Sequence, residues 1–307
     1  MRGNPKRQIS LSSLPKYLKR RKATENMSRN ISLIGAGRVG RSLLSALVNV
    51  GNNPVAIVSR SSRSAGSLAE MVRAPLFGED YSLIPETTDL IILTLPDDSL
   101  ESAVEVIKKD WKYKSGTLLI HTSGIKESSI LEPLRECGAK TAAIHPVASF
   151  PAENILPLEG VHFAVEGKDK GMAMDLVRSI GGIPFHIDAG KKALYHAACT
   201  FASGYLNILL ESSLKLMGEA GMEEARDVVT ALAKSSVEGW NENGVGSLTG
   251  SIARGDVESV RAHLKSLENS EEELGIYRIL ALKAVTECET KGILTREKAE
   301  ELKAALN

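Results

Sequence analysis

A strand-like run leads directly into a GxGxxG motif near the start of the chain. The residues are Ile31-Ser32-Leu33-Ile34-Gly35-Ala36-Gly37-Arg38-Val39-Gly40. In such a motif the first glycine permits a tight turn and the second lets the backbone approach a pyrophosphate. The third glycine lets the following helix pack closely on the strand, and the phosphates bind at the positive N-terminus of that helix. The motif alone is weak evidence, because a glycine-rich turn without a ligand has the same pattern.

The residues that follow the motif complete a βαβ unit. Apolar side chains recur at helical spacing after Gly40, and Gly51 is suited to end that helix. The short apolar run 54–58 then has the character of a buried second strand. This context predicts a dinucleotide site. We assign to cofactor binding the whole run Gly35, Ala36, Gly37, Arg38, Val39 and Gly40.

The residues that close the second strand indicate which cofactor is preferred. A site for NAD carries an acidic residue there, which binds the ribose 2′-hydroxyl. This chain instead has Ser59-Arg60-Ser61-Ser62-Arg63, without a carboxylate. Arginine attracts a 2′-phosphate and serine hydroxyls can donate to it. We therefore predict NADP(H), bound by Ser59, Arg60, Ser61 and Arg63; the alternative is an ordinary solvated basic loop.

The alternation of strands and helices continues to about Gly190 and then stops. Further strands are expected at 89–95, 117–120, 141–144, 161–165 and 183–187, with helices at 100–109, 130–137 and 172–180. Beyond Gly190 only helical spacing remains, over 191–217, 223–240, 257–267, 271–289 and 296–305. The expected fold is α/β, a Rossmann-type, doubly wound, mostly parallel sheet over 30–189. An all-α domain over 190–307, for substrate binding or dimerisation, follows it.

Charge is distributed unevenly along the chain. Residues 1–26 hold eight basic side chains and one acidic one, which leaves 30 basic and 37 acidic residues in the rest. The basic segment 1–29 is expected to lack fixed structure and to bind an anionic surface or act as a targeting segment. Alternatively, Met27 is the true start. The mildly acidic remainder has no footprint of nucleic-acid binding.

Other compositional features point to a protein of the cytoplasm without a metal. No apolar run is long enough to span a bilayer. The three cysteines are widely separated and favour reduced thiols. No group of histidine, cysteine or acidic residues has the spacing of a metal site.

Polar residues follow several of the expected strands. In an open α/β sheet the ligand lies beyond the carboxyl ends of the strands. We therefore assign Leu95 and Pro96 to cofactor binding, and His121, Ser123 and Gly124 to contact with the nicotinamide or substrate. His145, at the end of another strand, is assigned a catalytic role. The alternative for both histidines is a turn residue whose ring is satisfied by backbone.

The chain resembles proteins that join a Rossmann-like domain to a helical domain of unknown function. They are distant relatives of 6-phosphogluconate dehydrogenase, pyrroline-5-carboxylate reductase and ketopantoate reductase. The resemblance covers about residues 30–270. The motifs that carry it are the glycine run, Leu95-Pro96-Asp97, His121-Thr122-Ser123-Gly124, His145-Pro146, Tyr195-His196-Ala197-Ala198 and Leu248-Thr249-Gly250-Ser251-Ile252-Ala253-Arg254-Gly255-Asp256. The chain departs from the family pattern at Ser251, where proline is typical, and at Gly204, where asparagine is expected.

Lys192 and His196 are the foremost catalytic candidates of the helical half. They are four residues apart and share one helical face. The resemblance implies a lysine and an asparagine at this spacing, so His196 stands in place of the amide. Reduction of a carbonyl needs positive charge or a proton at the developing alkoxide, which Lys192 could supply. The alternative is a solvated helix start.

Thr249 and Arg254 are predicted to bind substrate from a glycine-flanked loop, where Arg254 could hold a carboxylate through two hydrogen bonds. Together these features predict an NADP-dependent oxidoreductase that transfers hydride to a small carbonyl or imine, such as a 2-oxo acid of the ketopantoate type. A protein that senses NADPH without catalysis is the alternative. By resemblance we expect a homodimer, with a small-molecule substrate and no nucleic-acid or membrane partner.

Overall fold

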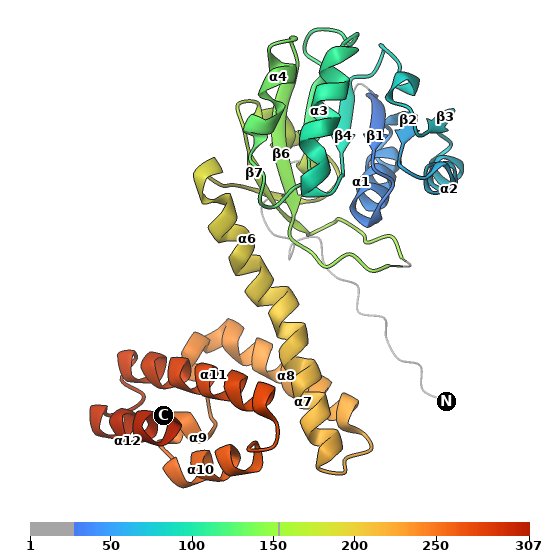
Figure 1. Ribbon diagram of the computed structural model, residues 1–307. Coiled ribbons are helices and arrows are strands. Elements are labelled where there is room, and N and C mark those ends of the chain that lie inside the picture. Colours follow the sequence, from blue (N-terminus) through green and yellow to red (C-terminus); the bar gives the residue numbers. More distant parts are fainter. Residues whose placement is uncertain (1–27, 153) are drawn as a thin grey trace, which may run out of the picture. The chain divides into compact units, whose positions relative to one another are not determined.

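A computed structural model describes residues 28–152 and 154–307 of the protein (Figure 1). The chain divides into two units, one ending at Cys199 and the other spanning Thr200–Asn307. The boundary therefore lies inside a helical run, later than the composition change at Gly190. Most of the predicted basic extension, and the alternative start at Met27, lie outside the described residues.

The first unit is built on an eight-stranded sheet with the order β3-β2-β1-β4-β5-β6-β7-β8. Neighbouring strands are parallel except β6 and β7, which are antiparallel. The strands are β1 (Asn30–Ile34), β2 (Asn53–Val58), β3 (Leu76–Gly78), β4 (Leu90–Leu93), β5 (Leu118–His121), β6 (Lys140–Pro146), β7 (His162–Glu166) and β8 (Ile183–His186). The predicted doubly wound, mostly parallel sheet is confirmed.

Helices cover both faces of this sheet, as its apolar strands require. These helices are α1 (Arg38–Asn49), α2 (Ser62–Val72), α3 (Leu100–Lys109), α4 (Glu132–Arg135) and α5 (Lys170–Ser179). A further helix, α6 (Lys192–Thr200), follows β8 in the chain. Alternate residues of β4 show the arrangement. Leu90 and Ile92 belong to the core cluster that includes residues of α1, α2 and α5, whereas Ile91 and Leu93 belong to the cluster with α3 and α4. Each face thus has its own core.

Two elements of the first unit, α2 and β3, were not expected from the sequence. Helix α2 begins where a basic loop was the alternative, and its buried side chains Ala65, Leu68, Ala69 and Val72 follow helical spacing. Strand β3 is only three residues long and none of them is fully buried, so it lacks the pattern of a core strand. The expected helix over 130–137 is instead a 3₁₀ turn, Ser128–Leu131, followed by the short α4.

The second unit is helical throughout, which confirms the predicted all-α region. It contains α7 (Leu206–Glu219), α8 (Ala225–Asn243), α9 (Ser251–Arg254), α10 (Val257–Ser266), α11 (Glu271–Thr290) and α12 (Arg296–Leu306). Its main core joins α10, α11 and α12 through Val260, Val285, Cys288 and Leu302. Within residues 28–152 and 154–307, no helix is both long and apolar enough to cross a membrane.

The structure refines one expectation for the helical half and corrects another. The helix predicted over 191–217 is confirmed as one continuous helical run, but a π-helical turn, Phe201–Tyr205, lies within it between α6 and α7. Gly204 lies in this turn. The segment holding Arg254 is a short helix, α9, rather than a loop, and it ends at Gly255 with a left-handed backbone (φ 69°) that glycine adopts without strain.

Candidate active site

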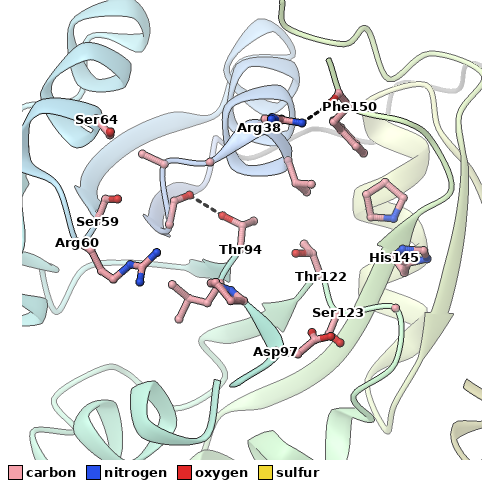
Figure 2. Close-up of a pocket in the computed structure, with 18 of the residues that line it drawn as sticks. Arg38, Ser59, Arg60, Ser64, Thr94, Asp97, Thr122, Ser123, His145 and Phe150 are labelled. Carbon is pink, nitrogen blue, oxygen red and sulfur yellow. Dashed lines mark hydrogen bonds between the residues drawn. The ribbon is translucent and has the colours of Figure 1, made fainter. Parts of the chain in front are cut away.

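A cavity of about 780 Å³ lies at the carboxyl ends of β1, β2, β4, β5 and β6. This volume lies within the range typical of small-molecule and cofactor pockets. Figure 2 shows Ser59 and Arg60 at one end of the cavity and His145 at the other, with Thr94 and Thr122 between them. The residues that the sequence placed at separate strand ends are thus brought to one cavity.

The glycine loop forms one wall of this cavity with different roles for its three glycines. Gly35 has a φ of 104°, and a Cβ atom there would lie 2.4 Å from the carbonyl oxygen of Thr94. A Cβ on Gly40 would lie 2.3 Å from the Gly35 carbonyl oxygen. Gly37, the N-cap of α1, has open space where a Cβ would be. The first and third glycines therefore permit close packing, and the second leaves the helix N-terminus accessible from the cavity.

Serine and arginine side chains form the end of the cavity after β2. Ser59, Arg60, Ser61 and Ser64 line it. The Ser61 hydroxyl caps α2 by accepting a hydrogen bond from the Ser64 N–H group at 3.3 Å. Of the residues predicted to bind cofactor, Arg63 is outside the lining, as is Gly40 behind the loop.

A carboxylate lies near the serine and arginine residues after β2, although the segment 59–63 itself contains none. Glu79, just after β3, accepts hydrogen bonds from the Ser62 backbone N–H at 3.0 Å and the Ser62 hydroxyl at 2.9 Å. These hydrogen bonds, the backbone one first, hold the pKa of Glu79 below its usual value. The segment after β2 has no acidic residue of its own, so this neighbour could only be found once β3 was placed beside β2.

The segment after β4 crosses the centre of the cavity. Thr94, Leu95, Pro96 and Asp97 line it. The Thr94 hydroxyl donates to the carbonyl oxygen of Gly35, and this bond ties the glycine loop to the neighbouring strand end (Figure 2). Leu95 and Pro96 were predicted to lie at the site, whereas Thr94 and Asp97 were not assigned to it from the sequence.

His145 occupies the far end of the cavity, against the helix α6. Its Nδ1 atom lies 2.7 Å from the Tyr195 hydroxyl, and its ring lies 5.7 Å from the ring of His196. Both histidines border Gly124, since a Cβ there would lie 2.9 Å from His145 Nε2 and 2.4 Å from His196 Cδ2, but of the two only His145 lines the cavity. Burial, together with the charges of His196 and Lys192, lowers the pKa of His145 to about 4.

Lys192 lies behind the cavity wall rather than in its lining. Its side chain is 3% exposed, and Nζ lies 3.4 Å from Glu166 Oε1 and donates to the Ser123 carbonyl oxygen at 3.1 Å. Burial lowers the pKa of Lys192, and the carboxylate of Glu166 opposes this shift. Glu166 also accepts hydrogen bonds from the N–H and hydroxyl of Ser128. The lysine therefore fixes the Ser123 peptide from behind.

His121 is also buried and lies outside the lining. Its Nδ1 accepts a hydrogen bond from the Ser123 N–H at 3.2 Å, so its Nε2 carries the hydrogen and donates to the Glu127 carbonyl oxygen at 3.2 Å. Burial, reinforced by the charge of Lys192, lowers the pKa of His121 to about 3. These contacts fit the alternative of a turn residue satisfied by backbone, whereas Ser123 and Gly124 do line the cavity.

The two other predicted substrate residues lie in the second unit. The guanidinium of Arg254 is exposed and donates to the Thr249 carbonyl oxygen. Asp256 caps α10 by accepting a hydrogen bond from the Ser259 N–H at 3.0 Å. Among the described residues, no group of three or more histidine, cysteine or acidic side chains could hold a metal ion.

Comparisons with known families match the two parts of the chain separately. Residues 20–146 match the model of a Rossmann-like domain, and residues 161–284 match that of a domain of unknown function, DUF2520. The second match therefore includes β7, α5 and β8 as well as α6 to α10 and most of α11. A search of the curated proteins gives no significant match.

Several solved structures share the fold. A candidate NADP oxidoreductase from Bacteroides fragilis is 21% identical, with a TM-score of 0.71 over 84% of this chain and 98% of that one. A protein from Thermotoga maritima is 22% identical, with a TM-score of 0.65 over 85% and 99%. A pyrroline carboxylate reductase from Plasmodium falciparum, solved with NADP bound, is 18% identical, with a TM-score of 0.54 over 91% and 98%. At these identities the likeness is one of fold.

Proposed function

Because the chain joins a Rossmann-like domain to a DUF2520 domain, we propose that it is an NADP-dependent oxidoreductase. Its substrate is a small carbonyl or imine compound, such as a 2-oxo acid. The observation that carries the proposal is the single cavity that runs from the open N-terminus of α1 to His145. A dinucleotide needs an accessible helix N-terminus for its pyrophosphate, as α1 offers. Reduction of a substrate beside the nicotinamide needs polar groups such as His145.

The residues of the cavity fit the cofactor. Gly37 leaves room for a pyrophosphate at the α1 N-terminus, where no side chain caps the helix. Arg60, with Ser59 and Ser61, offers a cation and hydroxyl donors for the 2′-phosphate. The fold of a reductase with NADP bound supports the same assignment.

Bound NADPH supplies a hydride to the electron-poor carbon of a carbonyl or imine. The chain must then stabilise the charge that develops on the oxygen or nitrogen. His145 and His196, with the Ser123-Gly124 peptide, are the groups we assign to this task. Lys192 acts as a positioning residue in this proposal, because its Nζ is directed to Ser123 and Glu166. Binding of a substrate carboxylate by Thr249 and Arg254 remains a prediction from the sequence, which Arg254→Lys tests through the substrate KM.

We also propose that the protein acts as a homodimer through its helical unit. Large apolar side chains are exposed on α7 and α8, with Ile208 57%, Leu232 56% and Trp240 65% exposed. Leu232 and Trp240 line one hollow with further apolar residues of α7 and α8, and contiguous exposed apolar surface is typical of interaction sites. Light scattering should give twice the chain mass of 33.0 kDa, and Leu232→Glu should give the single-chain mass.

Two measurements test the proposed function. Titration of the protein should show tighter binding of NADPH than of NADH, and Arg60→Ala should weaken only the binding of NADPH. Oxidation of NADPH should then be followed with a panel of 2-oxo acids and cyclic imines. Tighter binding of NADH would overturn the cofactor assignment. Tight binding of NADPH without turnover of any compound would favour the sensor instead.

A further inference from the structure

We propose that Tyr195 is a positioning residue that fixes the tautomer of His145, so that the Nε2 atom of His145 carries a hydrogen and donates it to the ligand in the cavity. The inference deepens the proposed function, because it defines the state in which one of the assigned groups meets the substrate. It concerns a contact between β6 and α6, whose two residues belong to separate motifs of the sequence.

The geometry holds the two rings in one arrangement. The Tyr195 hydroxyl lies 2.7 Å from His145 Nδ1, and the rings are 5.6 Å apart at 85°. The Tyr195 ring also contacts that of Phe185 of β8, with the ring centroids 6.1 Å apart. Contacts with two rings restrict the Tyr195 side chain, and its hydroxyl meets Nδ1, the nitrogen of His145 remote from Gly124.

The direction of the hydrogen bond follows from the charge states of the partners. Burial first, and then the charges of His196 and Lys192, keep His145 neutral at pH 7, while Asp97 acts weakly in the opposite sense. Burial, with the Cys199 side chain adding to it, raises the pKa of Tyr195 above its usual value, so its hydroxyl is also neutral at pH 7. A neutral imidazole has one donor nitrogen and one acceptor nitrogen.

Two arrangements of hydrogens are then possible. Either the phenol donates to Nδ1, or Nδ1–H donates to the phenol oxygen and the phenol hydrogen needs another acceptor. The Cys199 side chain also interacts with the hydroxyl, and sulfur is only a weak acceptor. The first arrangement uses the stronger donor and the stronger acceptor of the pair, so the imidazole hydrogen lies on Nε2.

The Nε2 atom faces the part of the cavity wall that has no side chain. A Cβ on Gly124 would lie 2.9 Å from it, and both residues line the cavity. A neutral N–H group there can donate to a carbonyl oxygen or imine nitrogen and to the charge that develops on it. Without the Tyr195 hydroxyl, the hydrogen could move to Nδ1, and Nε2 would offer a lone pair instead.

The experiment measures the tautomer directly in the full chain, without cofactor or substrate. Protein labelled with ¹⁵N-histidine is studied by long-range ¹H–¹⁵N correlation at pH 7, and the signals of His145 are identified by their loss in His145→Gln. We expect a pyridine-type Nδ1 and a pyrrole-type Nε2. A pyrrole-type Nδ1 in the unmodified protein would overturn the proposal, whatever any variant does.

Tyr195→Phe keeps the ring packing and removes only the hydroxyl. We expect its His145 signals to move toward the average of the two tautomers. Tyr113→Phe is the matched control, because Tyr113 is a buried tyrosine packed on Trp111, and it should leave the signals unchanged. Unchanged His145 signals in a folded Tyr195→Phe protein would also overturn the proposal.

Cofactor binding separates this inference from the proposed function. Tyr195→Phe should bind NADPH within about twofold of the unmodified protein, since Tyr195 is not among the lining residues. With a substrate in hand, it should lower kcat by about tenfold or more with a smaller change in KM, as expected when a catalytic hydrogen bond is lost. Failure of the unmodified protein to bind NADPH would overturn the proposed function and leave the tautomer result standing.

Discussion

The carboxylate of Glu79 accepts two hydrogen bonds from Ser62, one from the backbone and one from the hydroxyl, at the first residue of α2. A carboxylate of the protein itself therefore occupies hydrogen-bond donors beside the serines and the arginine that we assign to the 2′-phosphate. A phosphate and a carboxylate at neighbouring donors repel each other. If the site binds NADPH as proposed, we expect Glu79 to limit how strongly NADPH is preferred to NADH.

Glu79→Gln should therefore tighten the binding of NADPH and leave that of NADH unchanged. Because Glu79 is exposed and solvent screens its charge, the gain in affinity should be modest, about 3- to 10-fold. Isothermal titration with each cofactor measures it. Asp80→Asn is the matched control, because Asp80 accepts a hydrogen bond from the Ser82 N–H instead. Equal effects on both cofactors would contradict the prediction.

Alanine at Gly37 should impair cofactor binding, whereas alanine at Gly40 should impair stability. Gly37→Ala should leave the melting temperature unchanged, since the new Cβ meets no atom within 4 Å. It should weaken cofactor binding by at least about tenfold, because the methyl group enters the space reserved for the pyrophosphate. Gly40→Ala should instead lower the free energy of unfolding by about 1–3 kcal/mol. Thermal unfolding and NADPH titration of both variants check this pair, and reversed outcomes would contradict it.

Removal of Lys192 should destabilise the protein through Glu166. Lys192→Met leaves the 4% exposed carboxylate of Glu166 without its cation, a change that typically costs about 3–5 kcal/mol of stability. The double variant Lys192→Met/Glu166→Gln should recover part of the loss, because the amide oxygen can still accept from Ser128. Urea unfolding of the three proteins gives the values. If the double variant is no more stable than Lys192→Met, the loss of stability does not come from the unpaired carboxylate of Glu166.

Acid should destabilise the fold partly through His145. Its pKa is about 4 in the folded protein, below the ordinary value of 6.5. Between these pH values the unfolded chain binds a proton that the folded protein does not, so stability falls as the pH is lowered. The contribution is at most about 1.4 kcal/mol per pH unit.

His145→Gln should therefore show a shallower loss of unfolding free energy between pH 6.5 and pH 4 than the unmodified protein. His162→Gln is the control, because His162 is exposed on β7 and should leave the slope unchanged. The buried His121, whose pKa is about 3, contributes in the same direction in all three proteins. Identical slopes in all of them would exclude His145 as a source.

Much of the cavity could be predicted because parallel strands end at one edge of a sheet. That rule alone groups the glycine loop, Ser59, Pro96, Ser123 and His145, although none of them is close to all the others in sequence. The strands that lead to these residues were predicted from their apolar runs, whereas β3 was not. The sequence did not predict helix α2, although Ala65, Leu68 and Val72 follow helical spacing, because its serine- and arginine-rich start is typical of a loop.

Contacts between distant elements could not be predicted in this way. Glu79 reaches Ser62 only because the short β3 pairs with β2, and the Tyr195 hydroxyl meets His145 only because α6 packs at the end of β6. The spacing of Lys192 and His196 indicated a common helical face but not the depth to which the lysine side chain extends. Its ion pair with Glu166 depends on the position of β7, which the sequence of α6 does not contain.

One turn of α6 provides two hydrogen bonds that hold groups of the cavity in place. Lys192 binds the Ser123 carbonyl oxygen, and Tyr195, three residues later, binds His145. A displacement of α6 along its axis would therefore strain both hydrogen bonds in the same event. The orientation of the Ser123 peptide and the donor state of His145 are therefore mechanically coupled, because both depend on the position of one helix.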